Sequence, residues 1–406
     1  MSREGPRDRL LLLGASVRAL AASVLRSRRA RDRHPGDLLL LDFFADDDLA
    51  RRPRVRFPGP GGLARPRSTA ALGRAALALA AGGEGWGGLL FTGGLENHPG
   101  LLRLLARHAP ILGNDPRAVA RVRDPAQLAG VLEREGLLHA GVSALETAPA
   151  GGRWLLKRRR GAGGSGVREA QPGERRRPGE FLQARLDGAA GSIAFVAGGG
   201  EARLLGATTL LDATGSDATI AALAAPPFRY AGNIAGPMDA MLPPEALRLL
   251  ARAASRITAR FELCGLNGID YVLTDRGPVV LEVNPRFTAS MEILEECRGE
   301  SFIDRHLEAL DGALSSAAPP GAARTDWRAK GILYADRPLV APDPDLLVPL
   351  GARDRPRRGE TFEPGRPLCT LVVTGTGASD CRRRLAERAL AARGLFLSDA
   401  GPQHRP

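Results

Sequence analysis

Short apolar runs and helical stretches alternate along the first quarter of the chain. Leu10–Leu13 and Leu38–Leu41 are runs of four leucines, and the helical stretch Val17–Arg28 lies between them. A strand, a helix and a second strand that is apolar throughout predict a βαβ unit with buried parallel strands. Leu89–Phe91 adds another strand of this kind. We therefore expect a Rossmann-like α/β domain in residues 1–112.

Two glycine-containing turns follow strands of this domain. Gly14–Arg18 and Gly93–Asn97 each stand directly after an apolar run, and the second contains Glu96-Asn97. Open α/β sheets bind ligands at the carboxyl ends of their strands, so both turns are candidate ligand contacts. The alternative is that they are ordinary tight turns. Neither turn completes a G-x-G-x-x-G pattern, which weakens the case for a dinucleotide.

The apolar runs of the remaining chain predict two further domains. Strand-like runs and the amphipathic helix Pro244–Glu262 indicate an α+β domain in residues 113–312. The stretch Asp311–Arg324, which is rich in Ala, Pro and Gly, is typical of a linker. Short strands and a final helix then predict a small β-rich domain in residues 325–400. The strand-like runs of the middle domain include Trp154–Lys157, Glu180–Leu186, Ser192–Ala197 and Leu204–Leu211.

Residues 268–293 carry the most informative pattern. Two apolar, β-rich runs flank Asp275-Arg276-Gly277, and this arrangement predicts a β-hairpin with a three-residue loop. Directly opposite residues of such a hairpin lie close together on one face. The pairs expected from this loop are Thr274 with Pro278, Tyr271 with Leu281, and Asp270 with Glu282.

Three oxygen-bearing side chains share one face of the expected hairpin. Asp270 and Glu282 are opposed, and Asn284 lies two residues beyond Glu282 on the same face. Facing carboxylates repel unless a positive charge lies between them, and carboxylate and amide oxygens suit a hard divalent cation. We therefore expect these residues to bind Mg²⁺ or Mn²⁺. Arg286 adds a permanently charged group that suits phosphate or carboxylate. The alternative is a surface hairpin with solvated acids.

A glycine-rich loop follows Lys157. The loop can turn backbone N–H groups toward phosphate oxygens, and Lys157 at the end of a strand can reach the same phosphates. The alternative is a flexible linker. Only Lys157 and Lys330 among the 57 Lys and Arg residues are lysines, so each is a candidate for a task that needs a compact ammonium. The loop residues that we expect to contact phosphate are Gly163, Gly164, Ser165 and Gly166.

Composition narrows the class of protein. The net charge is +12, but the basic residues are scattered and aromatic residues make up only 4%, so we expect no nucleic-acid partner. Apolar content is 44% without a run long enough to span a membrane, so we expect no membrane partner. The four Cys show neither metal-ligand nor disulfide-framework spacing. A cytoplasmic location is the expectation that agrees with these features.

The hairpin resembles a known family. Asp270 together with Leu281-Glu282-Val283-Asn284-Pro285-Arg286 resembles the metal-binding hairpin of the ATP-grasp superfamily, which includes biotin carboxylase. The resemblance implies an α/β protein with an α+β core, an N-terminal Rossmann-like domain and a small C-terminal β-rich domain. It also implies that the two acids and Asn284 hold Mg²⁺ against the phosphates of ATP, and that Arg286 lies near a reacting acyl phosphate.

The same resemblance implies contacts with the nucleotide. Lys157 and the glycine-rich loop correspond to the phosphate-binding part of these enzymes. The segment from Gln183 to Leu186 resembles the one whose backbone binds adenine, and Asp187 is the candidate for the ribose. Many members carry an ATP-contacting Lys near the helix that begins at Asp124, and here Arg123 is the nearest cation. The implied adenosine contacts are Gln183, Ala184, Leu186 and Asp187.

The overall pattern, including Gly93–Asn97, is similar to a branch called predicted ATP-dependent carboligases. That resemblance implies a ligase that joins a small carboxylate to an amine through an acyl phosphate and releases ADP and phosphate. We expect Arg286 and Lys157 to be the catalytic residues. We also expect the enzyme to act in cofactor biosynthesis and to form a homodimer. Two alternatives stay open. One is carboxylation with bicarbonate, as in biotin carboxylase, and the other is an ATP-binding module without turnover.

Overall fold

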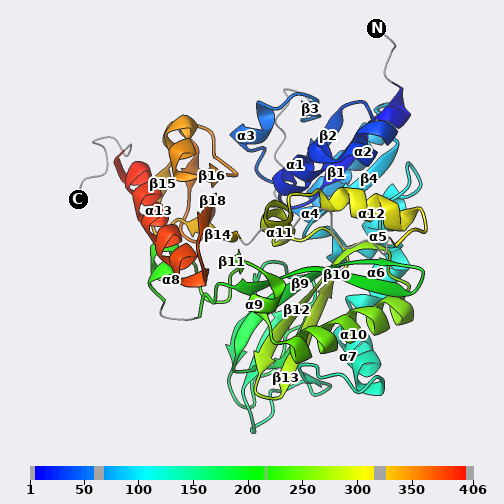
Figure 1. The fold of residues 1–406 in the computed structure, drawn as a ribbon, viewed down its shortest axis with the longest axis vertical. Coiled ribbons are helices and arrows are strands. Elements are labelled where there is room, and N and C mark those ends of the chain that lie inside the picture. The colour runs from blue at the N-terminus through cyan, green and yellow to red at the C-terminus, as the bar shows by residue number, and fades with distance from the viewer. Residues whose placement is uncertain (1–4, 59–67, 215–216, 315–325, 399–406) are drawn as a thin grey trace.

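A computed structural model describes residues 5–58, 68–214, 217–314 and 326–398. The N-terminal strands and helices lie at one end of the molecule, and the C-terminal helix α13 (Ala378–Ser398) lies with its strands on the opposite side (Figure 1). A large antiparallel sheet runs from the lower part of the molecule in Figure 1 into the C-terminal part. Most of the predicted linker, and the last residues of the predicted C-terminal domain, lie outside the described residues.

The N-terminal region is the parallel sheet that the leucine runs predict. Its strands have the order β3-β2-β1-β4, and β1 pairs in parallel with both neighbours. Every residue of β1, β2 and β4 is buried, which explains why these strands are apolar throughout. The strands are β1 (Leu10–Leu13), β2 (Leu38–Leu41), β3 (Val55–Arg56) and β4 (Gly88–Phe91). The helical elements are η1 (Pro6–Asp8), α1 (Arg18–Arg26), α2 (Arg28–Arg33), α3 (Asp47–Ala50), α4 (Thr69–Ala81), η3 (Leu95–Asn97) and α5 (Pro99–Leu105).

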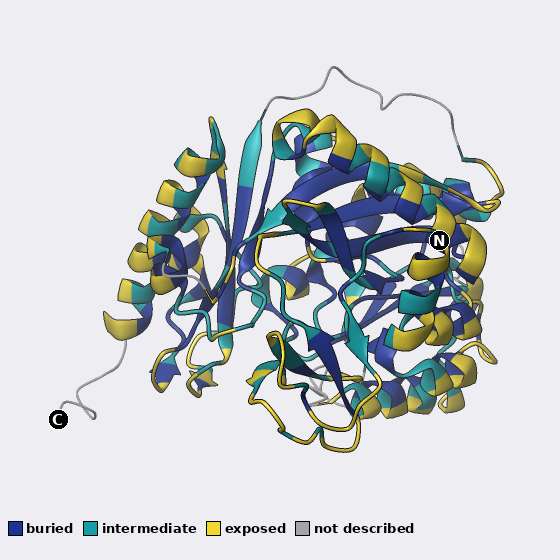
Figure 2. Cartoon of the chain, turned by 90° about the horizontal axis from the view of Figure 1, so that it is seen from below, coloured by how far each residue is buried: buried dark blue, intermediate teal, exposed yellow. Residues whose placement is uncertain are grey.

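An antiparallel sheet forms the centre of the molecule. Its strand order is β13-β12-β9-β10-β11-β14-β18-β16. In Figure 2 its strands are dark blue, whereas the helices around them turn exposed yellow faces outward. The central strands are β9 (Ala189–Gly198), β10 (Glu201–Leu210), β11 (Gly232–Ala235), β12 (Gly265–Thr274) and β13 (Gly277–Asn284). The helices of this region are α6 (Pro116–Val122), α7 (Pro125–Arg134), α8 (Ala218–Leu223), α9 (Met238–Met241), α10 (Pro244–Phe261), α11 (Met291–Arg298) and α12 (Phe302–Leu310).

The same sheet continues into the C-terminal region. β14 pairs with β11 on one side and with β18 on the other, so hydrogen bonds cross the proposed boundary between residues 312 and 325. The division into three domains therefore stays a prediction about how the chain is organised. The C-terminal elements are β14 (Trp327–Tyr334), β15 (Leu339–Val340), η4 (Pro344–Leu350), β16 (Ala352–Arg353), β17 (Thr361–Phe362), β18 (Pro367–Gly375) and α13 (Ala378–Ser398).

A second, smaller antiparallel sheet carries Lys157 and the glycine-rich loop. Its strand order is β5-β8-β6-β7. Its small apolar core, Ala148, Leu156 and Leu182, is separate from the main cores. The strands are β5 (Val142–Ser143), β6 (Trp154–Arg158), β7 (Arg168–Ala170) and β8 (Glu180–Ala184). The glycine-rich loop is thus the connection between β6 and β7.

The strands β12 and β13 form the expected hairpin, but with a different turn. Thr274 pairs with Gly277, so the loop consists of Asp275 and Arg276 and not of three residues. Gly277 has a φ of +110°, a conformation that other residues rarely adopt. The predicted pair of Thr274 with Pro278 is wrong, because Pro278 faces Leu273.

A β-bulge corrects the register further along the hairpin. Tyr271 pairs with Val280 and Asp270 pairs with Glu282, which leaves Leu281 as the extra residue. The predicted pair of Tyr271 with Leu281 is therefore wrong, whereas the predicted pair of Asp270 with Glu282 is confirmed. The turn is one residue shorter than predicted, and the bulge adds one residue to the second strand. The two shifts cancel, so Asp270 and Glu282 face each other as predicted.

Candidate active site

The hairpin places two carboxylates and an amide together. The Asn284 Nδ2 donates to Asp270 Oδ2 at 2.9 Å, so Asn284 shares a face with the acidic pair. Burial and the neighbouring charge of Glu282 raise the pKa of Asp270 to about 6. This pair is costly to ionise fully, because both charges lie close together in a largely dehydrated place.

Arg123 supplies the positive charge that the facing acids require. Its Nη1 lies 3.3 Å from Glu282 Oε2 and donates to the Val283 carbonyl oxygen at 3.0 Å. Burial alone would raise the pKa of Glu282, but Arg123, Lys157 and Arg286 outweigh it and hold that pKa at about 2. The side chain of Glu282 is 36% exposed, so solvent screens part of this effect. Arg123 therefore lies at the acids, although sequence analysis gave it no definite role.

Lys157 lies beside the bulge of the hairpin. Its Nζ donates to Gln183 Oε1 at 2.9 Å, and Gln183 Nε2 donates to the Leu281 carbonyl oxygen at 3.1 Å. The ammonium also lies 5.9 Å from the centre of the Phe181 ring. The side chain of Gln183 thus connects the two sheets, and it places Lys157 close enough to lower the pKa of Glu282.

The structure limits the expected adenine contacts. Gln183 and Ala184 belong to β8, which pairs on both sides along this stretch, and the Ala184 N–H donates to the Gly141 carbonyl oxygen at 2.8 Å. This N–H is therefore occupied, and an adenine contact through Ala184 would have to use its carbonyl oxygen. Leu186 and Asp187 lie beyond the end of the strand, and Asp187 accepts from Arg153 Nη1 at 3.0 Å. Backbone recognition of adenine through Leu186 stays a prediction.

The glycine-rich loop is held from two sides. Tyr230 N–H donates to the Gly163 carbonyl oxygen at 3.1 Å, and Asn97 Nδ2 donates to the Gly161 carbonyl oxygen at 2.8 Å. Gly164 has a φ of +74°, and a Cβ atom there would lie 1.7 Å from the Phe228 carbonyl oxygen. Only glycine allows this approach. Ser165 donates its N–H to Ala162 within the loop.

The turn after β4 completes the site. Glu96 is 1% exposed, and its Oε1 accepts from Arg286 Nε at 2.9 Å and from Arg286 Nη2 at 2.7 Å. Arg286 Nη2 also donates to Asn284 Oδ1 at 3.2 Å. Sequence analysis identified Gly93–Asn97 as a candidate ligand contact but gave Glu96 no role of its own. The signal that singles out Glu96 is an acid two residues after a Gly-Gly turn at the carboxyl end of a buried strand.

The donor set fits a magnesium ion. Asp270 and Glu282 offer carboxylate oxygens from one face, and the like-charged acids gain from a cation between them. The Asn284 amide turns its nitrogen toward Asp270 and its oxygen toward Arg286, so it would have to turn over to bind the same cation. Residues 5–58, 68–214, 217–314 and 326–398 contain no group of three or more His, Cys, Asp or Glu side chains with metal-binding geometry. A hard cation held by few protein ligands commonly completes its shell with water and nucleotide phosphates, which is the usual arrangement for Mg²⁺.

Residues 127–290 match the family model described as an ATP-grasp domain. The match includes the glycine-rich loop and the whole hairpin. This part of the chain is an ATP-grasp domain. The resemblance to the ATP-grasp superfamily inferred from the hairpin is thereby confirmed.

Solved structures confirm the ATP-grasp fold along nearly the whole chain. Biotin carboxylase from Campylobacter jejuni has a TM-score of 0.67 at 12% identity, with 97% of each chain covered. L-amino acid ligase from Bacillus licheniformis has a TM-score of 0.66 at 15% identity, with 94% of this chain and 97% of that chain covered. A third structure is the biotin carboxylase domain of 2-oxoglutarate carboxylase from Hydrogenobacter thermophilus, solved with MgADP. It has a TM-score of 0.63 at 13% identity, with 91% of this chain and 86% of that chain covered.

A curated relative matches only part of the chain. An uncharacterised protein of Methanocaldococcus jannaschii is 24% identical over 144 residues, which are 36% of this chain and 33% of that protein. The match thus spans about a third of the relative's length. At sequence identities of this size the solved structures show the fold alone. They do not identify the substrates of this protein.

A second charged cluster lies at the junction of the ATP-grasp domain with the N- and C-terminal regions. Glu292 on α11 accepts from Arg18 Nη2 at 2.7 Å, from Lys330 Nζ at 2.7 Å and from Arg353 Nη1 at 2.7 Å. Arg18 Nε also donates to Asp354 Oδ1 at 2.8 Å. Glu292 and Lys330 are 2% and 4% exposed. The second lysine of the chain therefore helps to join three regions.

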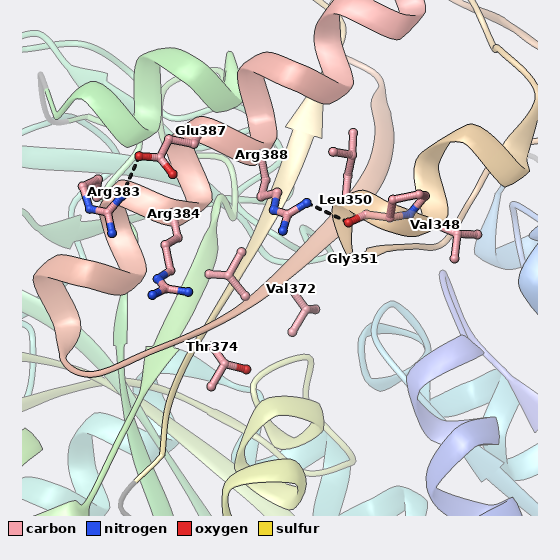
Figure 3. A pocket seen from close by; sticks show the side chains of 11 residues that line it. Val348, Leu350, Gly351, Val372, Thr374, Arg383, Arg384, Glu387 and Arg388 are labelled. Carbon is pink, nitrogen blue, oxygen red and sulfur yellow. Dashed lines mark hydrogen bonds and ion pairs between the residues drawn. The ribbon is translucent and has the colours of Figure 1, made fainter.

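A large open cavity lies in the C-terminal region and not at the hairpin. It has a volume of about 520 Å³ between η4, β18 and α13, and none of the predicted site residues lines it (Figure 3). Arg388 donates to the Pro349 carbonyl oxygen at 2.7 Å, whereas Arg383 and Arg384 pair with Asp380. These guanidinium groups are occupied by protein partners, so the cavity offers a poorer phosphate site than the ATP-grasp domain.

Proposed function

We propose that this protein is an ATP-dependent carboxylate–amine ligase. A substrate carboxylate attacks the γ-phosphate of ATP, an amine captures the resulting acyl phosphate, and ADP and phosphate leave. The observation that supports this most directly is the convergence of Lys157, Arg123 and Arg286 on the hairpin acids. Phosphoryl transfer depends on positioning and on charge stabilisation, and this arrangement provides both.

Each group has a defined task in this proposal. Lys157 places a compact positive charge beside the phosphates, and the loop from Gly163 to Gly166 offers backbone N–H groups. Asp270, Glu282 and Asn284 would hold Mg²⁺, which supplies charge neutralisation for the phosphates. Arg286, which Glu96 orients through two hydrogen bonds, stabilises the oxygens of the acyl phosphate.

Carboxylation is the second candidate. The fold of biotin carboxylase covers 97% of this chain, and bicarbonate would then replace the organic carboxylate. L-amino acid ligase superposes almost equally well, so the fold alone favours neither. We prefer amide formation because the sequence pattern around Gly93–Asn97 is similar to the carboligase branch. The ATP-binding module without turnover is the less favoured reading, because all the charged groups expected of a catalyst are present.

The test measures ADP release with panels of carboxylates and amines, followed by mass spectrometry of the product. We expect ADP only when both substrates are present, and a product mass equal to the sum of the two minus water. ADP formed with bicarbonate and biotin, without any amine, would favour carboxylation instead. Nucleotide binding without ADP release under all conditions would favour the module.

A matched pair of variants separates catalysis from folding. Glu282→Gln removes a proposed metal ligand, and Asp275→Asn changes an acid in the hairpin turn that takes no part in the site. We expect ADP release to fall about 100-fold or more in the first variant and to stay unchanged in the second. Equal activity of both variants would contradict a catalytic role for Glu282.

The setting of the enzyme belongs to the same proposal. A homodimer, a cytoplasmic location and a place in cofactor biosynthesis stay predictions, and light scattering of the purified protein tests the first. Among the described residues, no helix has the length and apolar character needed to cross a bilayer.

A further inference from the structure

Arg123 occupies a position where a metal ion and a guanidinium compete for the same acid. It lies 3.3 Å from Glu282 and donates through Nη2 to Asn97 Oδ1 at 3.2 Å. Its side chain is only 13% exposed. A divalent cation bound to Glu282 would stand close to this permanent positive charge, and the two like charges would repel each other even though solvent screens part of the repulsion. Arg123 must therefore leave Glu282, or weaken its contact, when a metal binds.

Two buried polar atoms without partners show where Arg123 can go. They are Arg123 Nε and Glu96 Oε2. Glu96 uses only its other oxygen, Oε1, for Arg286. An unpaired buried carboxylate oxygen and an unpaired buried guanidinium N–H each cost free energy, so a rearrangement that joins these groups is favourable.

Arg123 and Glu96 share Asn97 as a neighbour, and Glu96 acts electrostatically on Arg123. Asn97, which anchors Arg123, is the residue next to Glu96. Burial by itself would lower the pKa of Arg123, but the carboxylates of Glu282, Glu96 and Asp270 raise it above the ordinary value. Asn97 provides a fixed point about which the guanidinium can turn from one carboxylate to the other.

We propose that Arg123 is the counter-ion of Glu282 in the metal-free enzyme and that Glu96 receives it when a divalent cation takes its place. The inference rests on the metal site of the proposed function. Glu96 then has two tasks, because it orients Arg286 through one oxygen and accepts Arg123 through the other. Both residues act on the metal site as positioning residues, without being ligands themselves.

The exchange also reaches the glycine-rich loop. Asn97 donates to the Gly161 carbonyl oxygen through its Nδ2 and accepts from Arg123 through its Oδ1. A movement of Arg123 therefore changes the charge next to the side chain that holds the loop. Metal binding therefore reaches the contact that holds the loop at Gly161.

The experiment measures Mn²⁺ binding by electron paramagnetic resonance in the absence of nucleotide, so it does not depend on turnover. Arg123→Gln removes the competitor, and we expect Mn²⁺ to bind about threefold tighter or more. Glu96→Gln removes the acceptor, and we expect binding to weaken by a similar factor. In the double variant Glu96→Gln should have no further effect, because no guanidinium has to be accepted.

Controls keep the result interpretable. Arg121→Gln changes an exposed arginine two residues away, which pairs with Glu262, and should leave Mn²⁺ binding unchanged. Arg123→Lys keeps the charge and should resemble the wild type, which guards against a folding defect in Arg123→Gln. Near-ultraviolet circular dichroism compares the packing of all variants.

Three outcomes would overturn the inference. The first is Mn²⁺ affinity that is unchanged or weaker in Arg123→Gln, and the second is an effect of Glu96→Gln that is the same with and without Arg123. In both cases ADP release by the wild type would leave the proposed function intact. The third is Mn²⁺ binding by the wild type that does not respond to Asp270→Asn, which would remove the metal site and thus overturn both proposals.

Discussion

His306 should make the stability of the protein depend on pH. It is 5% exposed on α12, where its Nδ1 accepts from the Leu266 N–H at 2.8 Å and its Nε2 pairs with the Leu112 carbonyl oxygen at 2.9 Å. This arrangement requires a neutral imidazole that carries its proton on Nε2. A second proton on Nδ1 would destroy the first hydrogen bond and place a charge in the core. Burial accordingly lowers the pKa of His306 to about 4.

The size of the effect follows from linkage. An unfolded His titrates near pH 6.5, so below that pH the unfolded chain binds a proton that the folded chain does not accept. The folded state therefore loses stability as the pH falls from about 6.5 to about 4. With these two pKa values the loss is about 2 kcal/mol at pH 5 and about 3 kcal/mol below pH 4.

The assay compares the free energy of unfolding of the wild type and of His306→Gln at pH 7.5 and pH 5. Glutamine keeps a hydrogen-bonding side chain but does not titrate. The variant is needed because Glu295, whose pKa burial raises to about 7, changes stability in the opposite direction over the same range. We expect the wild type to lose about 2 kcal/mol more than the variant on acidification.

Two results would refute this reasoning. One is an identical pH dependence in the wild type and in His306→Gln. The other is a nuclear magnetic resonance titration of the folded protein in which the His306 ring protonates near pH 6.5, because an ordinary pKa leaves no difference between the folded and unfolded states.

Three further outcomes are expected. Lys157→Arg should lower ADP release about 10- to 100-fold, because a planar guanidinium cannot replace a compact ammonium between phosphates. Near-normal ADP release would show that Lys157 takes no part in catalysis. Glu292→Gln should lower the free energy of unfolding by about 3–5 kcal/mol, because it leaves Arg18 and Lys330 without their shared carboxylate. Glu245→Gln, which changes an exposed ion pair, should lower it by less than about 1 kcal/mol. Mg·ATP should raise the melting temperature and NAD should not; the reverse result would contradict the nucleotide assignment.

The sequence by itself determined the features that depend on local periodicity. Four-residue leucine runs that alternate with helical stretches favour buried strands of a covered sheet, and β1 and β2 are such strands. The pairing of Asp270 with Glu282 was also predicted, but the prediction is right only because the shorter turn and the bulge at Leu281 compensate. The turn itself was not predictable, because two-residue and three-residue loops around glycine have similar sequences, and the bulge at Leu281 has no local signature.

Only the tertiary structure decided how the charges are shared. Glu96, Arg123 and Arg286 come from a turn, a helix end and a hairpin, and they are far apart in the chain. The same holds for Lys330. The sequence marked it as unusual because it is one of only two lysines, but its partner, Glu292, lies on another element. Periodicity records which side of an element is buried, whereas an ion pair depends on which elements the fold brings together. Electrostatic partners are therefore set by the packing of the three regions and not by the local pattern of the chain.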